Sequence, residues 1–197
     1  MAIVISAFAC SENRGSEHEL GWKCIKECAA RSDEVHLFTS VAVNPGIYVQ
    51  IQKHELNSVV VHGVDFCKAV DFVLKSIPWG CGYQVAAYVW EFRLWLHMYG
   101  RYPRRGFELG IKSTYGSYRW PSFLWYFSQQ FHLDPLSGGG RCPIRFHRFL
   151  SARGRSKEMF RLFLQYATLC DPFVLLTLLK ANKIFAGNAA TRSILPG

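Results

Sequence analysis

The sequence predicts an α/β fold: a Rossmann-like, doubly wound parallel sheet with helices on both faces. Short continuous runs of apolar, β-branched residues are typical of strands that are covered on both sides. Segments with helical periodicity alternate with these runs, which is the order that a parallel sheet requires. Of the 197 residues, 50% are hydrophobic and 19% are charged, a balance that argues against a disordered chain and suits one domain over residues 1–197.

The first forty residues predict a βαβ unit. Residues 3–9 form an apolar run that predicts a strand, and residues 10–17 are polar and contain Gly15, which predicts a loop. Residues 18–31 place Leu20, Cys24 and Cys28 on one helical stripe, and residues 34–39 predict a second strand. Parallel neighbours need a crossover connection, which we expect to be right-handed.

The middle of the chain predicts further alternation of helices and strands. Residues 47–55 suit a helix, residues 57–62 a strand, and residues 66–75 a helix that ends before Pro78. Residues 83–99 predict a long helix that is apolar nearly all round, which favours burial against the sheet over a place at an interface. Residues 107–112 predict a short strand.

The last third of the chain predicts a helix, a glycine-rich loop and a basic helical region. We expect a helix to start at Arg119-Trp120-Pro121 and to run to about residue 130, with residues 131–133 extended. Basic helices follow from residue 143 to residue 180, and Asp171 before Pro172 is expected to cap the last of them. Residues 183–186 predict a final strand.

The net charge of +9 points to an anionic partner. Its arginines and lysines gather in residues 101–105 and 141–161, and such clusters attract the phosphates of nucleic acid, anionic lipid or a diphosphate ligand. Solvated helix faces explain the same pattern equally well. The basic residues lack the aromatic interleaving of a recognisable nucleic-acid-binding sheet, so we expect no nucleic-acid partner.

The chain shows no sign of a leader or a membrane span. The N-terminus has no basic region before its apolar run, and residues 83–99 contain Glu91 and Arg93, so this helix lies at most on a membrane surface. The seven cysteines have no paired CxxC spacing, and no second ligand pair accompanies Cys24 and Cys28. We therefore expect no metal, and buried free thiols in a cytoplasmic protein.

Two loops are candidates for ligand binding. Asn13-Arg14-Gly15-Ser16-Glu17 joins the first strand to the first helix, where backbone N–H groups and the helix dipole favour an anionic phosphate. The same spacing suits an ordinary capping box made by Ser16 and Glu19. Ser137-Gly138-Gly139-Gly140 allows close approach of the backbone to a ligand and equally suits a flexible turn. His18 and His132 flank these loops, although each more often has a structural role.

Four segments resemble one family in the same order along the chain. Residues 7–40 (AFACSENRGSEHELGWKCIKECAARSDEVHLFTS) look like the opening of the family 4, GT-B fold bacterial glycosyltransferases of the GSE…GW subgroup. Residues 113–125 (STYGSYRWPSFLW) are similar to the segment that lines the acceptor pocket of that family. Residues 134–143 (DPLSGGGRCP) resemble its glycine-rich loop, and residues 183–196 (KIFAGNAATRSILP) its last strand and helix before the interdomain crossover.

The resemblance implies the N-terminal, acceptor-binding half of a retaining glycosyltransferase that needs no cofactor. In such enzymes a nucleotide-sugar is the donor substrate, and a glycan or a lipid-linked intermediate of polysaccharide biosynthesis is the acceptor. Carried over, Gly15 and Ser16 would meet the donor diphosphate and Glu17 would order their loop. The acceptor side would be shaped by Thr114, Arg119, Gly138 and Gly139. Backbone donors of this kind stabilise the charge that grows on a leaving diphosphate.

Several departures from the family pattern accompany these matches. The nucleotide-sugar domain is absent from residues 1–197, so we expect a truncated or split enzyme whose isolated chain does not transfer a sugar. Residues 110–113 lack a histidine that the family often has, and Asp134, Ser137 and Gly140 replace its preferred residues. The alternative is a non-catalytic binding module that pairs with a separately encoded donor domain. The basic helices would place either protein in the cytoplasm at the inner membrane face.

Overall fold

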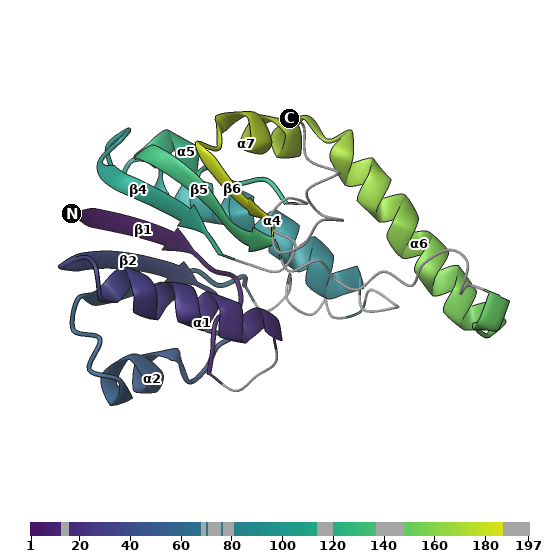
Figure 1. Cartoon of the computed structure of the whole chain (residues 1–197), viewed down its shortest axis with the longest axis horizontal. Coiled ribbons are helices and arrows are strands. Elements are labelled where there is room, and N and C mark those ends of the chain that lie inside the picture. The colour runs from purple at the N-terminus through teal and green to yellow at the C-terminus, as the bar shows by residue number, and fades with distance from the viewer. Residues whose placement is uncertain are drawn as a thin grey trace.

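The described part of the chain builds one parallel sheet. The computed structural model describes residues 1–12, 16–67, 70, 76, 81–113, 120–136 and 148–186. Six strands follow the order β3-β2-β1-β4-β5-β6, and each neighbouring pair is parallel (Figure 1). The strands are β1 (Ala2–Ser6), β2 (Glu34–Thr39), β3 (Val59–Gly63), β4 (Phe107–Lys112), β5 (Ser128–Leu136) and β6 (Lys183–Ala186). The predicted Rossmann-like α/β fold is confirmed.

Helices alternate with the strands, and α1 and α4 pack on the sheet. They are α1 (Ser16–Ala29), α2 (Ile47–Lys53), α4 (Cys81–Met98), α5 (Leu124–Phe127), α6 (Ala152–Leu169) and α7 (Pro172–Lys180). In the view of Figure 1, α1 lies in front of the strands and α4 lies behind them. Several of the bounds were predictable from sequence: those of β2, β4 and β6 match the expected ranges, and those of α1, α2, β3 and α4 lie within a few residues of them.

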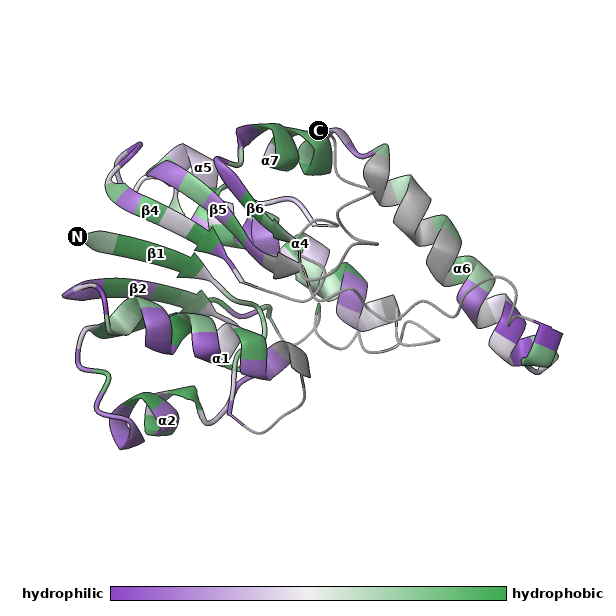
Figure 2. Ribbon diagram, in the orientation of Figure 1, coloured by the Kyte–Doolittle hydropathy of each residue, from purple (hydrophilic) through white to green (hydrophobic). Residues whose placement is uncertain are grey.

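Alternate side chains of β1 divide between two hydrophobic clusters. Ile3 and Ile5 pack with Trp22 and Ile25 of α1, whereas Val4 packs with Trp90 of α4. This division follows from the pleat of a strand, in which successive side chains point to opposite faces. The hydropathy colouring of Figure 2 accordingly shows β1 as hydrophobic, while α1 alternates between hydrophobic and hydrophilic residues.

The helix that we predicted from Arg119 to about residue 130 is wrong. The helical part is the single turn of α5, which begins after Phe123, and β5 already starts at Ser128. Ser128 ends the turn because its hydroxyl donates to the carbonyl of Leu124 at 2.7 Å. Its backbone pairs with Phe107 of β4, so strand pairing takes residues 128–130 away from the helix. Local propensity is often overridden by tertiary pairing in this way.

The long helix α4 is buried on one face only. Ala87, Trp90, Leu94 and Met98 follow a helical stripe into the core, as expected for a helix that packs on the sheet. The apolar residues at other positions, Val85, Val89 and Leu96 among them, are exposed. The expected helix over residues 66–75 lies mostly outside the described residues, and so do residues 143–147 at the start of the expected basic region.

Asp171 caps α7 as predicted. Its carboxylate accepts from the backbone N–H groups of Phe173 at 2.8 Å and Val174 at 3.3 Å. The hydroxyl of Tyr88 on α4 also donates to this carboxylate, so the cap joins two helices. The preceding helix, α6, extends away from the sheet in Figure 1. No helix in the described ranges is long and apolar enough to cross a membrane.

Candidate functional site

The sheet order creates a switch point between β1 and β4. From β1 the chain continues to β2 on one side, whereas from β4 it continues to β5 on the other side. The carboxyl ends of the two strands are neighbours, since Ser6 is in register with Lys112. Ligands of open α/β sheets bind in the crevice beyond the strand ends at such a point. The candidate site is therefore the carboxyl edge of β1, β4 and β5.

Each segment that carries predicted site residues follows one of these three strands in the chain. Residues 13–15 come after β1, residues 114–119 after β4, and residues 137–147 after β5, and these three strands are adjacent. Ser16 and Glu17 are the first two residues of α1, but their side chains lie outside the described part of the structure. The remaining predicted residues also lie outside the described ranges: Gly15, Thr114, Arg119, Gly138 and Gly139.

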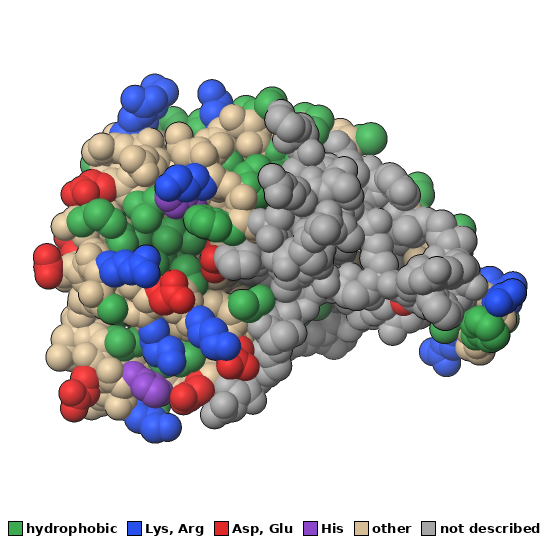
Figure 3. Space-filling view, viewed as in Figure 1, with side chains coloured by type: hydrophobic (Ala, Val, Ile, Leu, Met, Phe, Trp, Pro, Cys, Tyr) green, Lys and Arg blue, Asp and Glu red, His purple; other side chains and the backbone are tan. Residues whose placement is uncertain are grey.

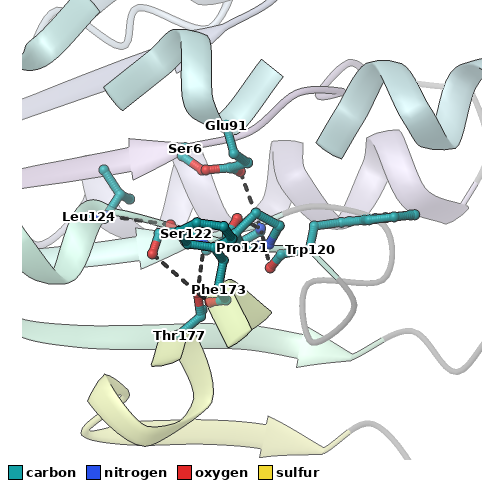
Figure 4. A network of polar contacts seen from close by, with 9 residues as sticks. Ser6, Glu91, Trp120, Pro121, Ser122, Leu124, Phe173 and Thr177 are labelled. Atoms are coloured by element: carbon teal, nitrogen blue, oxygen red, sulfur yellow. Dashed lines mark hydrogen bonds and ion pairs between the residues drawn. The ribbon is translucent and has the colours of Figure 1, made fainter. Parts of the chain in front are cut away.

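A buried ion pair lies directly beneath the switch point. The Nζ atom of Lys112 is 3.2 Å from Oε1 of Glu91, and the two side chains are only 1% and 3% exposed (Figure 4). Ser6, in register with Lys112 on β1, donates its hydroxyl to the same carboxylate oxygen at 3.1 Å. Burial raises the pKa of the Glu91 carboxyl and lowers the pKa of the Lys112 ammonium, while their mutual attraction opposes both shifts.

Lys112 also holds the chain where it returns from residues 114–119. Its ammonium donates to the carbonyl oxygens of Trp120 at 3.0 Å and Pro121 at 2.6 Å (Figure 4). With Glu91 these acceptors occupy all three ammonium protons, so Lys112 has a positioning role and no proton free for a ligand. Thr177 of α7 secures the next residue, because its hydroxyl accepts from the N–H of Ser122 at 2.8 Å.

A second polar group joins α1 to the ends of β4 and β5. The hydroxyl of Ser113 donates to Oδ2 of Asp134 at 2.7 Å. Burial raises the pKa of Asp134, while hydrogen bonds from Ser113 and Cys24 act in the opposite direction. Cys24 and Cys28 share a hydrogen bond that raises the pKa of the first thiol and lowers the pKa of the second. Asp134, which departs from the family pattern, thus has a structural partner in this chain.

Asn44 fixes the loop that follows β1. Its side-chain amide donates to the carbonyls of Phe8 at 3.0 Å and Ser40 at 2.9 Å, and its Oδ1 accepts from the N–H of Cys10 at 2.9 Å. The residue is 1% exposed, so these bonds form away from competing water. Asn44, which follows β2, therefore fixes the backbone of residues 8–10 that leads to the Gly-Ser-Glu loop.

The same loop closes onto α1 and α2. Ser11 bonds to His18 of α1 twice, through its hydroxyl to Nδ1 and through its N–H to the carbonyl, each at 3.1 Å. Glu12 lies 3.2 Å from Nε2 of His54, and this hydrogen bond lowers the pKa of Glu12. Gly21 allows the close approach of α1, because a Cβ there would be 2.9 Å from the carbonyl oxygen of Ala9. His18 thus has a structural role, because it holds Ser11 in the chain that follows β1.

The other expectations have mixed outcomes. His132 lies within β5 between Ile111 and Lys183, so it belongs to the sheet and not to the strand ends. Glu19, the partner expected in a capping box, forms an ion pair with Lys23 at 3.1 Å.

Cys10, Cys24 and Cys28 are buried free thiols as expected, whereas Cys67 and Cys170 are exposed. In the described part of the chain, no group of three or more histidine, cysteine or acidic side chains is arranged to hold a metal.

Sequence reasoning missed the residues that shape this edge. Lys112 ends an apolar strand and Glu91 lies in an apolar helix, and two opposite charges in such surroundings are a signal for a buried pair. Asn44 gave no signal, because its role depends on the meeting of two loops. Searches of protein-family models, curated proteins and solved structures find no match to this chain. The glycosyltransferase family therefore stays a prediction from the sequence motifs.

Proposed function

We propose that this chain is the acceptor-binding half of a retaining glycosyltransferase that moves a sugar from a nucleotide-sugar to a glycan or lipid-linked acceptor. One observation carries the proposal. The three segments that carry the predicted site residues follow β1, β4 and β5 in the chain, and these are adjacent strands around the switch point. Long stretches of chain separate these three strands, so it is the fold that makes their carboxyl ends neighbours.

The helix α1 suits one wall of a diphosphate site. It has 14 residues and begins at Ser16, directly after the loop. A helix of this length presents unpaired N–H groups and a positive dipole end to an anion. The described chain that leads to it is held through Cys10, Ser11 and Glu12, whose partners are Asn44, His18 and His54. The opposite wall would come from a nucleotide-sugar domain.

Binding mapped by nuclear magnetic resonance tests this proposal. Uridine diphosphate and a set of soluble oligosaccharides are titrated into the isotopically labelled 197-residue chain. We expect amide shifts around residues 12–18 with the nucleotide, and around residues 112–120 and 134–140 with an accepted oligosaccharide. Arg119→Gln should weaken oligosaccharide binding, while Arg153→Gln on exposed α6 should not. Shifts confined to other parts of the sheet, or none with any ligand, would contradict the proposal.

An anionic membrane surface is the partner that α6 favours. Arg153 and Arg155 near its start are exposed, and so are the apolar side chains of Met159 and Phe163 further along. On the face in Figure 3, basic and acidic side chains are intermixed over α1 and α2, whereas basic and hydrophobic ones gather at the far end of α6. A helix of this composition lies in the interface of anionic bilayers.

Vesicle sedimentation tests the membrane contact. We expect the chain to pellet with vesicles that contain phosphatidylglycerol, to stay in solution with purely zwitterionic vesicles, and to be released by salt. The double variant Arg153→Gln/Arg155→Gln should lose most of the binding, whereas Lys53→Gln on α2 should keep it. Binding that is insensitive to salt and to the arginine changes would exclude α6 as an electrostatic contact.

A further inference from the structure

A cationic cavity lies at the edge of the sheet opposite to the candidate site. It has a volume of about 170 Å³ and lies where β4 and β5 begin, close to the end of α7. Its lining comprises Arg104, Arg105, Trp125, Tyr126, Ser128, Gln129, Phe131, Lys180 and Asn182. The strands start at this edge, whereas the candidate site lies beyond their carboxyl ends. Two of its arginines belong to the basic cluster of residues 101–105, which the proposed function leaves without a role.

Three positive charges face this small volume without a negative one. Arg104, Arg105 and Lys180 line the cavity, and none of the nine lining residues is acidic. The guanidinium of Arg104 lies 5.5 Å from the ring centre of Tyr126, and Nζ of Lys180 lies 5.9 Å from that of Trp125. Aromatic faces offset only part of the repulsion between like charges. A bound anion would remove the repulsion.

Hydrogen bonds fix the walls of the cavity before any ligand is bound. The N–H of Arg105 donates to the carbonyl of Tyr126 at 3.1 Å, and Arg105 adopts a left-handed conformation with φ of 55°. Asn182 and Phe131 exchange two hydrogen bonds of 2.8 Å. The indole Nε1 of Trp125 is buried and has no acceptor among the described residues. Buried donors without an acceptor are uncommon in folded proteins.

We infer that this cavity binds a phosphate-bearing small molecule, with Arg104, Arg105 and Lys180 neutralising the phosphate dianion. Arginine presents several N–H groups in a plane and binds phosphate through paired hydrogen bonds, while lysine adds a point charge. Pockets for larger organic ligands occupy about 300–1,000 Å³. The cavity therefore suits a phosphate with a small substituent and excludes a nucleotide-sugar, which separates this ligand from the proposed donor.

Calorimetric titration with inorganic phosphate and with glycerol 3-phosphate tests the inference on the 197-residue chain. We expect saturable binding that weakens with salt, and amide shifts at Arg105, Ser128 and Asn182. Arg104→Gln and Lys180→Gln should each raise the dissociation constant about tenfold, since each removes a charged hydrogen-bond donor. Lys53→Gln removes an exposed charge outside the cavity and should leave the constant unchanged. Circular dichroism of each variant shows that it remains folded.

The same variants separate a soluble ligand from a lipid headgroup. If glycerol 3-phosphate binds in solution, the ligand is a soluble phosphate ester. If vesicles with phosphatidic acid bind more tightly than phosphatidylglycerol vesicles of equal charge, and Arg104→Gln abolishes this difference while Lys53→Gln does not, the ligand is a phosphomonoester headgroup. Absence of both kinds of binding overturns the inference, and so does phosphate binding that neither cavity variant weakens.

Discussion

Lys112 and Glu91 depend on each other at the scale of single residues. Either charge alone would be buried without compensation, because both side chains are almost completely enclosed. A buried pair often adds little to stability compared with apolar residues, but removing one partner costs about 3–5 kcal/mol. The main role of the pair is therefore to position the backbone after residue 119, since Lys112 also binds the carbonyls of Trp120 and Pro121.

Replacing Lys112 alone should destabilise the protein strongly. We expect Lys112→Met to lower the free energy of unfolding by about 3–5 kcal/mol, because Glu91 is left buried and unpaired. Urea denaturation measures the change. The double variant Lys112→Met/Glu91→Leu should recover most of the loss. A single variant as stable as the original chain would show that Glu91 takes up a proton or reaches solvent at little cost.

At the scale of elements, the contact between α1 and the loop after β1 depends on Gly21. An added Cβ would lie 2.9 Å from the carbonyl oxygen of Ala9 and 3.0 Å from Cβ of Cys10. We expect Gly21→Ala to lower the free energy of unfolding by about 1–3 kcal/mol, as overpacking does elsewhere. Gly46→Ala is the matched control, because its nearest neighbour is 3.8 Å away, and it should change stability little. Equal stability of both variants would contradict the close approach.

The cap of α7 is a second contact between elements. Asp171→Ala removes the acceptor of two backbone N–H groups and of the Tyr88 hydroxyl. We expect a loss of about 1–2 kcal/mol in thermal or urea unfolding, which is the usual cost of a lost N-cap. Asp171→Asn keeps an acceptor at the cap and should retain about half or more of the free energy that the aspartate cap contributes. If alanine and asparagine act alike, the cap contributes nothing beyond the charge.

At the scale of the whole molecule, His62 should make stability depend on pH. Burial lowers its pKa from 6.5 to about 4, with the neighbouring His36 adding to the shift. As pH falls from 6.5 toward 4, the unfolded chain binds a proton that folded His62 does not accept. The contribution of neutral His62 to the free energy of unfolding is thus fully present above this pH window. It falls by about 1–2 kcal/mol within the window, after allowance for solvent screening. Unfolding curves of His62→Gln should lack this part of the decline; parallel curves would refute it.

Much of the fold follows from local patterns, while the site depends on contacts across the chain. The strands β2, β4 and β6 are short apolar runs between turn residues, so their bounds were predictable. The residues 120–130 are aromatic at both helical and strand spacing, and pairing with β4 decides the outcome. Asn44 acts through Phe8 and Cys10, which lie more than thirty residues away, and one sequence cannot reveal such partners.

The hydrogen bonds from Lys112 to Trp120 and Pro121 have a consequence for which sequence changes this protein can tolerate. One side chain holds both ends of the six-residue stretch 114–119, since Lys112 adjoins Ser113 and binds Trp120. Closing a longer loop costs little, about 0.6 kcal/mol for each doubling of its length. The stretch can therefore be lengthened or replaced while the sheet keeps its stability. Selectivity for a new ligand could evolve there, or be grafted by design, without refolding the scaffold.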